Sequence, residues 1–221
     1  PQEATSPVPQ NETLPTPCVT VTDAPQKAPP RLIGEAFKTY ILCEYDGKLC
    51  LIDKHAAHER VIFNRMKQQA KNNAFQVLLM PVTVTLSKQE YAAALEHLDE
   101  FSACGFSIED FGGNRILVRE CPMLLDPSDV EDVVLEIASN VLMNKSDVQS
   151  QRIDRMYATA ACKAAIKAGN SNTPQELQAL AEQVLLNNDA RFCPHGRPTV
   201  IEMSQYVDCG NHARRIGRTR R

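Results

Sequence analysis

Side chains that bind transition metals are concentrated in two short segments that lie far apart in the chain. The first segment contains Asp53, His55 and Glu59 and directly follows a run typical of a strand. The second contains Cys193 and His195 beside a proline and a glycine. Carboxylate, imidazole and thiolate groups are the usual protein ligands of zinc and similar ions. Neither segment alone makes a site, but together they offer the ligands that one or two ions need.

The spacing within each segment is compatible with a shared site. His55 and Glu59 are four residues apart, so on a helix they project from one face. Cys193 and His195 are two residues apart, and a bent loop lets both point the same way. Simpler interpretations stay open on the residues alone. The first pair also fits an exposed salt-linked pair, and the second fits a turn with a buried cysteine.

The mixture of ligand types predicts two metal roles. The carboxylates of Asp53 and Glu59 are hard oxygen ligands that suit manganese or magnesium. Cys193 and His195 are softer and suit zinc. We therefore expect one tightly held ion that organises the site and one labile ion that performs chemistry. Divalent ions of this kind promote hydrolysis of phosphodiesters.

Three motifs resemble those of a known family, the MutL mismatch-repair proteins, in their C-terminal endonuclease domain. Residues 53–60 resemble its Asp-Gln-His-Ala-x-x-Glu motif, residues 161–163 its Ala-Cys-Arg/Lys motif, and residues 193–198 its Cys-Pro-His-Gly-Arg-Pro motif. The order and spacing also agree over roughly residues 31–215. Three departures are Lys54 in place of Gln, Asn64 in place of a second Glu, and His212 at the start of a closing Phe-x-Arg motif.

The resemblance implies a metal-dependent endonuclease that nicks one DNA strand in mismatch repair. It implies zinc for control and manganese (or magnesium) for catalysis, whereas ATP acts only through a separate N-terminal ATPase domain. The implied catalytic residues are Asp53, His55 and Glu59, and the implied metal ligands are these three with Cys193 and His195. Residues implied to support the site are Cys162, Lys163, Arg197 and Arg214. The alternative function is a zinc-stabilised dimerisation and partner-docking module without catalysis, which the departures at Asn64 and His212 favour.

Simpler interpretations of the supporting residues also stay open. Cys162 has alanine neighbours and fits a core helix position, and Lys163 fits a solvated charge. Arg197 fits either a phosphate or a carboxylate partner.

The resemblance extends to partners. Residues 76–81 resemble the Gln-x-x-Leu/Ile-x-Pro segment with which bacterial members touch the replication sliding clamp, through Gln76, Leu79 and Pro81. An ordinary buried strand is the alternative, although Pro81 favours a sheet edge. The other implied partners are a second copy of the chain in a homodimer, DNA, and the mismatch-recognition protein MutS.

The expected fold class is α+β with two subdomains. Residues 1–30 are rich in proline and predict a disordered linker. Residues 31–85 and 146–221 are expected to form a dimerisation and metal-site subdomain, into which residues 86–145 insert an external regulatory α+β subdomain. We expect the sheet of the first subdomain to be covered by the helices that begin near His55 and Asp147.

Turn and capping signals in the sequence indicate where the helices and strands begin and end. Asp46-Gly47 predicts a tight hairpin between strands at 40–45 and 48–52, followed by a helix from about residue 55 to 71. A strand at 76–86, broken at Pro81, precedes a capping box at Ser87 and a helix that ends near residue 105. The remaining expected elements are a hairpin around Gly112-Gly113, helices at 128–143, 147–168 and 173–188, and a strand at 198–203.

Composition narrows the function classes. The net charge of -3 argues against a strongly basic nucleic-acid binder, although arginines crowd the last eight residues. The 8 cysteines are scattered, so we expect reduced thiols rather than a disulfide framework. Neither a membrane span nor a signal peptide is expected, which predicts a cytoplasmic, nucleoid-associated protein without membrane partners.

Overall fold

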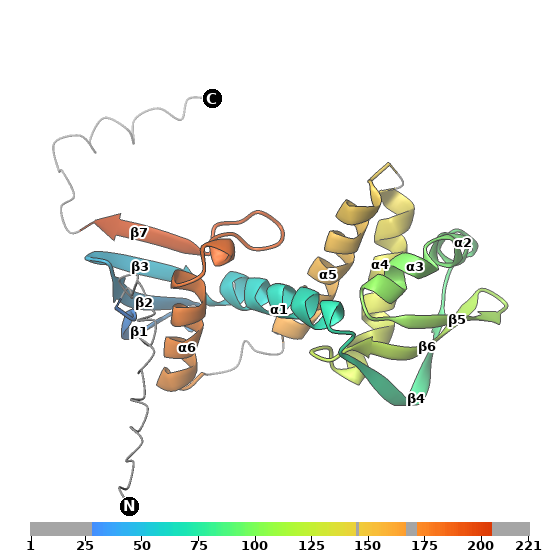
Figure 1. Ribbon diagram of the computed structural model, residues 1–221, viewed down its shortest axis with the longest axis horizontal. Coiled ribbons are helices and arrows are strands. Elements are labelled where there is room, and N and C mark those ends of the chain that lie inside the picture. Colours follow the sequence, from blue (N-terminus) through green and yellow to red (C-terminus); the bar gives the residue numbers. More distant parts are fainter. Residues whose placement is uncertain (1–27, 145, 167–171, 205–221) are drawn as a thin grey trace, which may run out of the picture.

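The computed structural model describes residues 28–144, 146–166 and 172–204, which form two lobes joined along one long helix (Figure 1). The fold mixes helices and sheets, which confirms the expected α+β class. The first lobe contains a four-stranded antiparallel sheet in the order β1-β2-β3-β7. Its elements are β1 (Arg31–Ala36), β2 (Tyr40–Tyr45), β3 (Lys48–Asp53), α6 (Pro174–Leu185), η3 (Asn188–Ala190) and β7 (Val200–Ser204).

The second lobe contains a three-stranded antiparallel sheet in the order β4-β6-β5 with helices against it. Its elements are β4 (Phe75–Thr85), α2 (Lys88–Glu96), α3 (Leu98–Ala103), β5 (Ser107–Gly112), β6 (Arg115–Pro122), η1 (Pro127–Asp129), α4 (Val130–Met143) and α5 (Gln149–Ile166). The long helix α1 (Lys54–Lys71) joins the lobes. No described helix is long and apolar enough to cross a membrane.

The β2–β3 hairpin brings the first metal-binding segment to the end of a strand. Asp46 and Gly47 both have positive φ, 52° and 69°, as a two-residue turn of the primed type requires. Tyr45 pairs with Lys48 across this turn, which confirms the predicted hairpin. Asp53 ends β3, and its side chain accepts the N–H of Ala56 at 3.0 Å, so it caps the N-terminus of α1.

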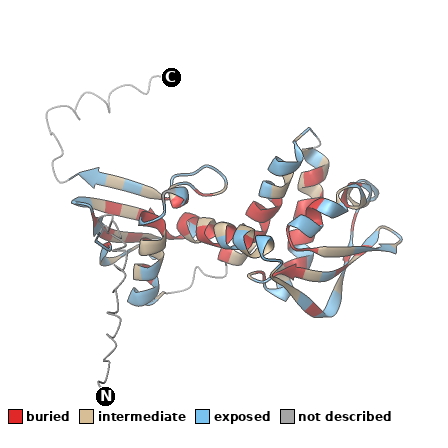
Figure 2. Cartoon of the chain, in the orientation of Figure 1, coloured by how far each residue is buried: buried red, intermediate tan, exposed pale blue. Residues whose placement is uncertain are grey.

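Two hydrophobic cores share α1 (Figure 2). Ala57 and Val61, in the N-terminal half of the helix, pack with the inner face of the first sheet and with α6. Phe63 and Met66, further along, belong to the core of the second lobe, as does most of α5. The helix that covers the first sheet beside α1 is therefore α6, so the expectation that the helix near Asp147 covers it was wrong. A helix packs where its apolar stripe finds a partner, and the stripe of α5 faces the larger second core.

No helix of the described residues packs against the opposite face of the first sheet. Leu42, Leu51 and Ile201 lie in register across β2, β3 and β7, and Leu49 and Met203 form the next row. None of these five side chains belongs to either core of the described residues. Ile201 is 56% exposed. A sheet with one covered and one open apolar face is a candidate for association.

In the second lobe, β4 forms an edge of the sheet. It pairs with β6 from Phe75 to Val77 and again from Val82 to Thr85, with a register shift between the two stretches. The residues between them make no ladder pairs, which agrees with the predicted break at Pro81. The capping box at Ser87 is confirmed, because Ser87 and Glu90 exchange hydrogen bonds. The helix that it starts is interrupted at His97, which separates α2 from α3.

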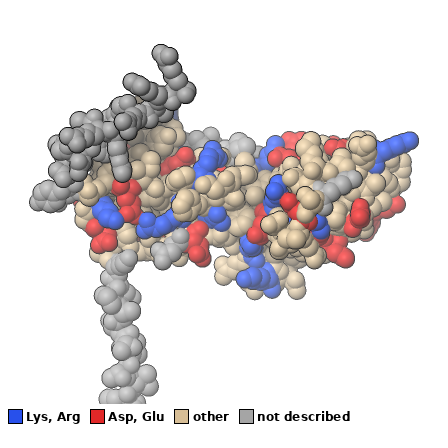
Figure 3. All heavy atoms as spheres, turned by 90° about the horizontal axis from the view of Figure 1, so that it is seen from above, with Lys and Arg blue, Asp and Glu red and all other residues tan. Residues whose placement is uncertain are grey.

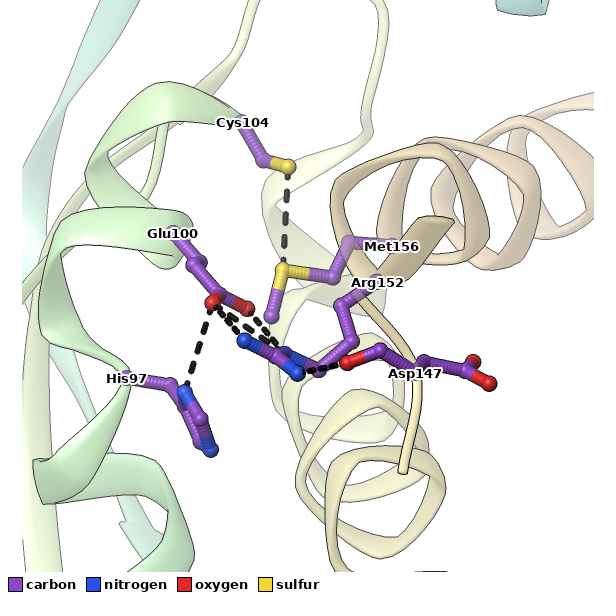
Figure 4. Close-up of polar contacts among 6 residues, drawn as sticks. All are labelled: His97, Glu100, Cys104, Asp147, Arg152 and Met156. Atoms are coloured by element: carbon purple, nitrogen blue, oxygen red, sulfur yellow. Dashed lines mark hydrogen bonds and ion pairs between the residues drawn. The ribbon is translucent and has the colours of Figure 1, made fainter. Parts of the chain in front are cut away.

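A buried ion-pair cluster fixes α3 to α5 (Figure 4). Arg152 donates hydrogen bonds to both carboxylate oxygens of Glu100, and the closest approach is 2.5 Å. His97 Nδ1 lies 3.4 Å from the same carboxylate, and Arg152 also donates to the carbonyl of Asp147. Beside this cluster the Tyr157 hydroxyl donates to the Ala103 carbonyl at 2.7 Å. These contacts hold the short helix α3 although it has no side-chain cap of its own.

Candidate metal centre

The structure brings together Glu59, Cys193 and His195 from the two segments that the sequence singled out. One ligand atom from each lies within 4.8 Å of the others. Glu59 is 0% exposed and Cys193 is 1% exposed, whereas His195 is open to solvent. Two of the three ligands are therefore buried, Glu59 on α1 and Cys193 in the loop that precedes β7, and only His195 of that loop faces solvent.

The surroundings of the Glu59 carboxylate fit a bound cation. Neither oxygen has a hydrogen-bond partner among the described residues, although both are buried. His195 Nδ1 lies 2.6 Å from Oε1, but the pair does not have hydrogen-bond geometry, and Arg197 Nη2 lies 3.8 Å from Oε2. A buried carboxylate without hydrogen bonds is strongly destabilising unless a positive charge balances it. With a thiol and an imidazole beside it, the donor set is one that zinc accepts.

The loop from Cys193 to Arg197 is a tight turn that aims its thiol inward. The N–H of Cys193 donates to the Arg197 carbonyl at 2.8 Å, and the N–H of Gly196 donates to the Cys193 carbonyl at 2.9 Å. The N–H of Arg197 points at the Cys193 sulfur, 3.3 Å away, and would stabilise a thiolate there. Gly196 has a φ of +84°, which only glycine adopts without strain.

Contacts with α1 and β3 fix the position of this loop. Arg60, which follows Glu59 on α1, donates from its guanidinium to the Phe192 carbonyl. The backbone N–H of Asp53 donates to the Thr199 carbonyl at 2.9 Å. The Thr199 hydroxyl donates to the Ala190 carbonyl at 2.5 Å. On sequence alone Arg60 fitted a carboxylate partner, an approach to DNA or a surface position equally well, and nothing in the pattern showed that it would reach a carbonyl more than a hundred residues away.

Asp53 and His55 lie outside the three-residue cluster. The Asp53 side chain caps α1, and its position directly before a helix was the signal for that role. His55 is exposed and lines a separate pocket of about 580 Å³ together with His58 and Arg65. Lys54, the departure from the family motif, is buried and pairs with Glu35 at 2.6 Å. The predicted roles of Asp53 and His55 as ligands thus stay predictions.

The supporting residues lie at different distances from the cluster. Cys162 projects half-buried from α5, and its pKa is raised by burial and then by the nearby charge of Glu59. Lys163 lies 4.0 Å from Asp132, at the limit of an ion pair. Arg197 is adjacent to Glu59 and largely exposed. Arg214 lies outside the described residues.

Residues 33–172 match the model of a family described as the MutL C terminal dimerisation domain. This match covers more than half of the 221 residues and includes α1 and the whole second lobe. The chain belongs to this MutL family. The resemblance seen in the motifs is thereby confirmed.

Curated MutL relatives support the same assignment. The chain is 39% identical over 176 residues to a DNA mismatch repair protein MutL of Clostridium botulinum, which covers 79% of the chain and 26% of that relative. The MutL of Clostridium acetobutylicum is 37% identical over the same length, and that of Clostridium perfringens is 36% identical over 179 residues. The chain spans about a quarter of the length of these MutL relatives.

Proposed function

We propose that the chain is a metal-dependent endonuclease of DNA mismatch repair, which hydrolyses a phosphodiester in one strand. The observation that carries the proposal is the buried Glu59 carboxylate, which lacks hydrogen bonds and lies beside Cys193 and His195. Membership of a MutL family supplies DNA mismatch repair as the setting. A buried carboxylate that accepts no hydrogen bond from the described residues, and whose nearest guanidinium lies 3.8 Å away on the largely exposed Arg197, is costly for a purely structural module and useful to one that holds a cation.

In this proposal Glu59, Cys193 and His195 hold zinc, and Asp53 and His55 add the ligands of a manganese (or magnesium) ion. Bound divalent ions neutralise phosphate charge and make water more acidic. Arg197 lies over Glu59 with most of its guanidinium exposed, so it is placed to hold a phosphate oxygen with paired donors. The hydrogen bonds within the turn from Cys193 to Arg197 hold the Cys193 sulfur close to Glu59.

Plasmid nicking in manganese tests the proposal with the variants Asp53→Asn and Glu59→Gln. Asparagine caps helices as well as aspartate does, so Asp53→Asn keeps the start of α1 and removes only the charge. We expect each variant to lose at least about 100-fold in nicking rate, as is common when a group essential to the chemistry is removed. Zinc content, measured by atomic emission, should fall for Glu59→Gln and stay at the wild-type level for Asp53→Asn. Wild-type nicking by both variants would contradict the proposal.

The alternative is a zinc-stabilised dimerisation and docking module without catalysis. The position of His55 outside the cluster and the capping role of Asp53 favour it. In that case we expect the wild-type chain to bind zinc and not to nick plasmid DNA at any manganese concentration. The same assay therefore separates the two functions.

The uncovered face of the first sheet is the surface that we assign to a homodimer. Membership of a family of dimerisation domains supports a second copy as the partner. Leu42, Leu51 and Ile201 form a continuous apolar row across three strands, with Leu49 and Met203 beside it. Two such faces are self-complementary about a twofold axis, which is the commonest symmetry of homodimers.

The edge of β4 is the surface that we assign to the sliding clamp. Leu79 is 103% exposed and Met80 is 83% exposed, and residues 78–81 make no ladder pairs with β6. An extended, unpaired segment with apolar side chains suits docking in a groove. The Gln76 amide instead donates to the carbonyls of Pro122 and Leu125, at 2.9 and 2.5 Å, so it anchors the segment in the isolated chain.

The remaining partners concern the whole protein. We propose that the mismatch-recognition protein MutS directs the nicking of DNA. ATP acts through the separate ATPase domain that the family resemblance implies.

A further inference from the structure

A polar groove of about 1460 Å³ begins at the candidate metal centre and runs along α1. His195 and Pro194 lie at one end, and the walls come from α1, α4 and α5. Figure 3 shows basic and acidic side chains mixed over the middle of one face of the molecule. The net charge of this face therefore does not mark it as a DNA-binding surface. The positions of the individual charges within the groove are more informative.

Three cations of the groove lie in a line on α1. Arg60, Lys67 and Lys71, here called the α1 stripe, are separated by seven and four residues. At 3.6 residues per turn, positions seven and eleven residues after Arg60 return to within about 20° of its direction. The stripe starts one residue after Glu59 and extends for about 16 Å along the helix axis. That length matches about five phosphates of one strand, at a rise of about 3.4 Å each.

The acids that line the groove lie on elements other than α1. They are Glu136 on α4, Asp154 on α5 and Asp189 in η3. Asp154 pairs with Lys67 at 2.7 Å, and both side chains are partly exposed. Arg155, the remaining cation of the lining, pairs with Asp147. Lys71 is exposed and forms no ion pair with any residue that the structure describes.

We propose that the α1 stripe holds the sugar-phosphate backbone of DNA beside the metal centre, and that Asp154 competes with phosphate for Lys67. This inference rests on the proposed function, because DNA is taken as the substrate. Because the three cations lie on one face of a single helix, they present their charges along a line that a nucleic-acid backbone can follow. Arg60 connects the two roles, because its guanidinium also holds the Phe192 carbonyl at the base of the metal-binding loop.

DNA binding by the 221-residue chain, measured without divalent metal by fluorescence anisotropy of a labelled duplex, tests the inference. Lys71→Glu should weaken binding about five- to tenfold at 0.1 M salt and reduce the slope of log K against log salt by about one. The matched control is Lys88→Glu, because Lys88 is also exposed and lies on α2, outside the lining of the groove. Lys88→Glu should bind as the wild type does.

A second variant changes binding in the opposite direction, which misfolding does not do. Asp154→Asn removes the acid that pairs with Lys67, so it should tighten DNA binding severalfold. Wild-type affinity in both Lys71→Glu and Asp154→Asn would overturn the inference. Equal losses in Lys71→Glu and Lys88→Glu would also overturn it, because they would indicate a general effect of charge.

The assay separates this inference from the proposed function. Binding is measured without metal, so an absence of nicking contradicts the endonuclease and leaves the test of the α1 stripe intact. Conversely, nicking that requires Glu59 together with wild-type binding in both Lys71→Glu and Asp154→Asn retains the endonuclease and excludes the stripe.

Discussion

Glu59 and Glu100 are both buried carboxylates, and they differ in what surrounds them. Glu100 accepts three hydrogen bonds from Arg152 and faces His97. The hydrogen bonds from Arg152 hold the pKa of the Glu100 carboxyl below its usual range, although burial acts in the opposite direction. Glu59 has no such hydrogen bonds among the described residues. The contrast indicates that Glu100 stabilises the fold, whereas Glu59 is arranged for a cation.

Glu100→Gln should therefore reduce the free energy of unfolding by about 3 kcal/mol at pH 7, because it breaks a buried ion pair. Since the folded-state pKa of Glu100 is depressed, its contribution is complete above the unfolded pKa of about 4.3. The contribution is lost as pH falls through the lower folded-state pKa. Urea unfolding of both proteins from pH 7 to pH 3 checks this.

The matched control for that experiment is Glu109→Gln, which breaks the exposed pair with Arg119. It should cost less than about 1 kcal/mol, because exposed ion pairs contribute little. Equal losses for Glu100→Gln and Glu109→Gln would contradict the structural role of Glu100.

At the residue scale the sequence predicted part of the site. The ligand types identified Glu59, Cys193 and His195, which the fold brings together. Asp53 was predicted only as a ligand, although an aspartate directly before a helix is also a typical N-cap, and the cap is the contact that forms. The burial of Lys54 against Glu35 depends on how β1 pairs with β2, which no local pattern specifies.

At the element scale, the sequence correctly predicted the turns and helix starts that depend only on neighbouring residues. The Asp46-Gly47 hairpin and the capping box at Ser87 depend on neighbouring residues and are confirmed, and the helix expected from residue 173 begins with a second capping box at Thr173. The strand β1 was not recognised, because its sequence, Arg-Leu-Ile-Gly-Glu-Ala, does not alternate cleanly between apolar and polar residues. A bulge after Leu32 also interrupts its pairing with β2. The partner of the first sheet was assigned to the wrong helix, since α5 and α6 are both amphipathic and sequence does not say which core each joins.

The exposed edge of β4 is a feature of a single element. Its proposed role as the docking site of the sliding clamp is tested by measuring clamp binding. Leu79→Ser should weaken binding to the sliding clamp roughly tenfold or more, because a buried leucine side chain is worth about 1.5–3 kcal/mol. Surface plasmon resonance with immobilised clamp measures the effect. Met143→Ser is a suitable control, since Met143 is 78% exposed at the end of α4. Equal affinities of Leu79→Ser and the wild type would leave β4 as an ordinary edge strand.

At the scale of the whole molecule, the open sheet face determines the expected assembly. Leu51 lies in the middle of that face, paired with Leu42 on one side and Ile201 on the other. Leu51→Arg should convert a dimer at micromolar concentration into a monomer, because it places a charge in a desolvated apolar interface. Sedimentation velocity checks this.

Val148→Arg, on the second lobe, is the control for the assembly experiment and should stay dimeric. A wild-type chain that sediments as a monomer at micromolar concentration would contradict the assignment of this face.

The two cores differ in how they are distributed along the chain. The buried members of the second core lie between Ile62 and Ala165 in one continuous stretch. The first core combines residues 41–61 with residues 177–190, and β7 completes its sheet by pairing with β3. As the chain leaves the ribosome, the second lobe has all of its buried residues before α6 has been made. The first sheet is complete only when β7 has been synthesised. We therefore expect the loop with Cys193 to reach Glu59 after the C-terminal half of α1 has already packed into the second core. We therefore expect the candidate metal centre to be among the last parts of the described chain to assemble. A chain that ends between residues 166 and 192 would keep every buried residue of the second core and would lack the loop that brings Cys193 and His195 to Glu59.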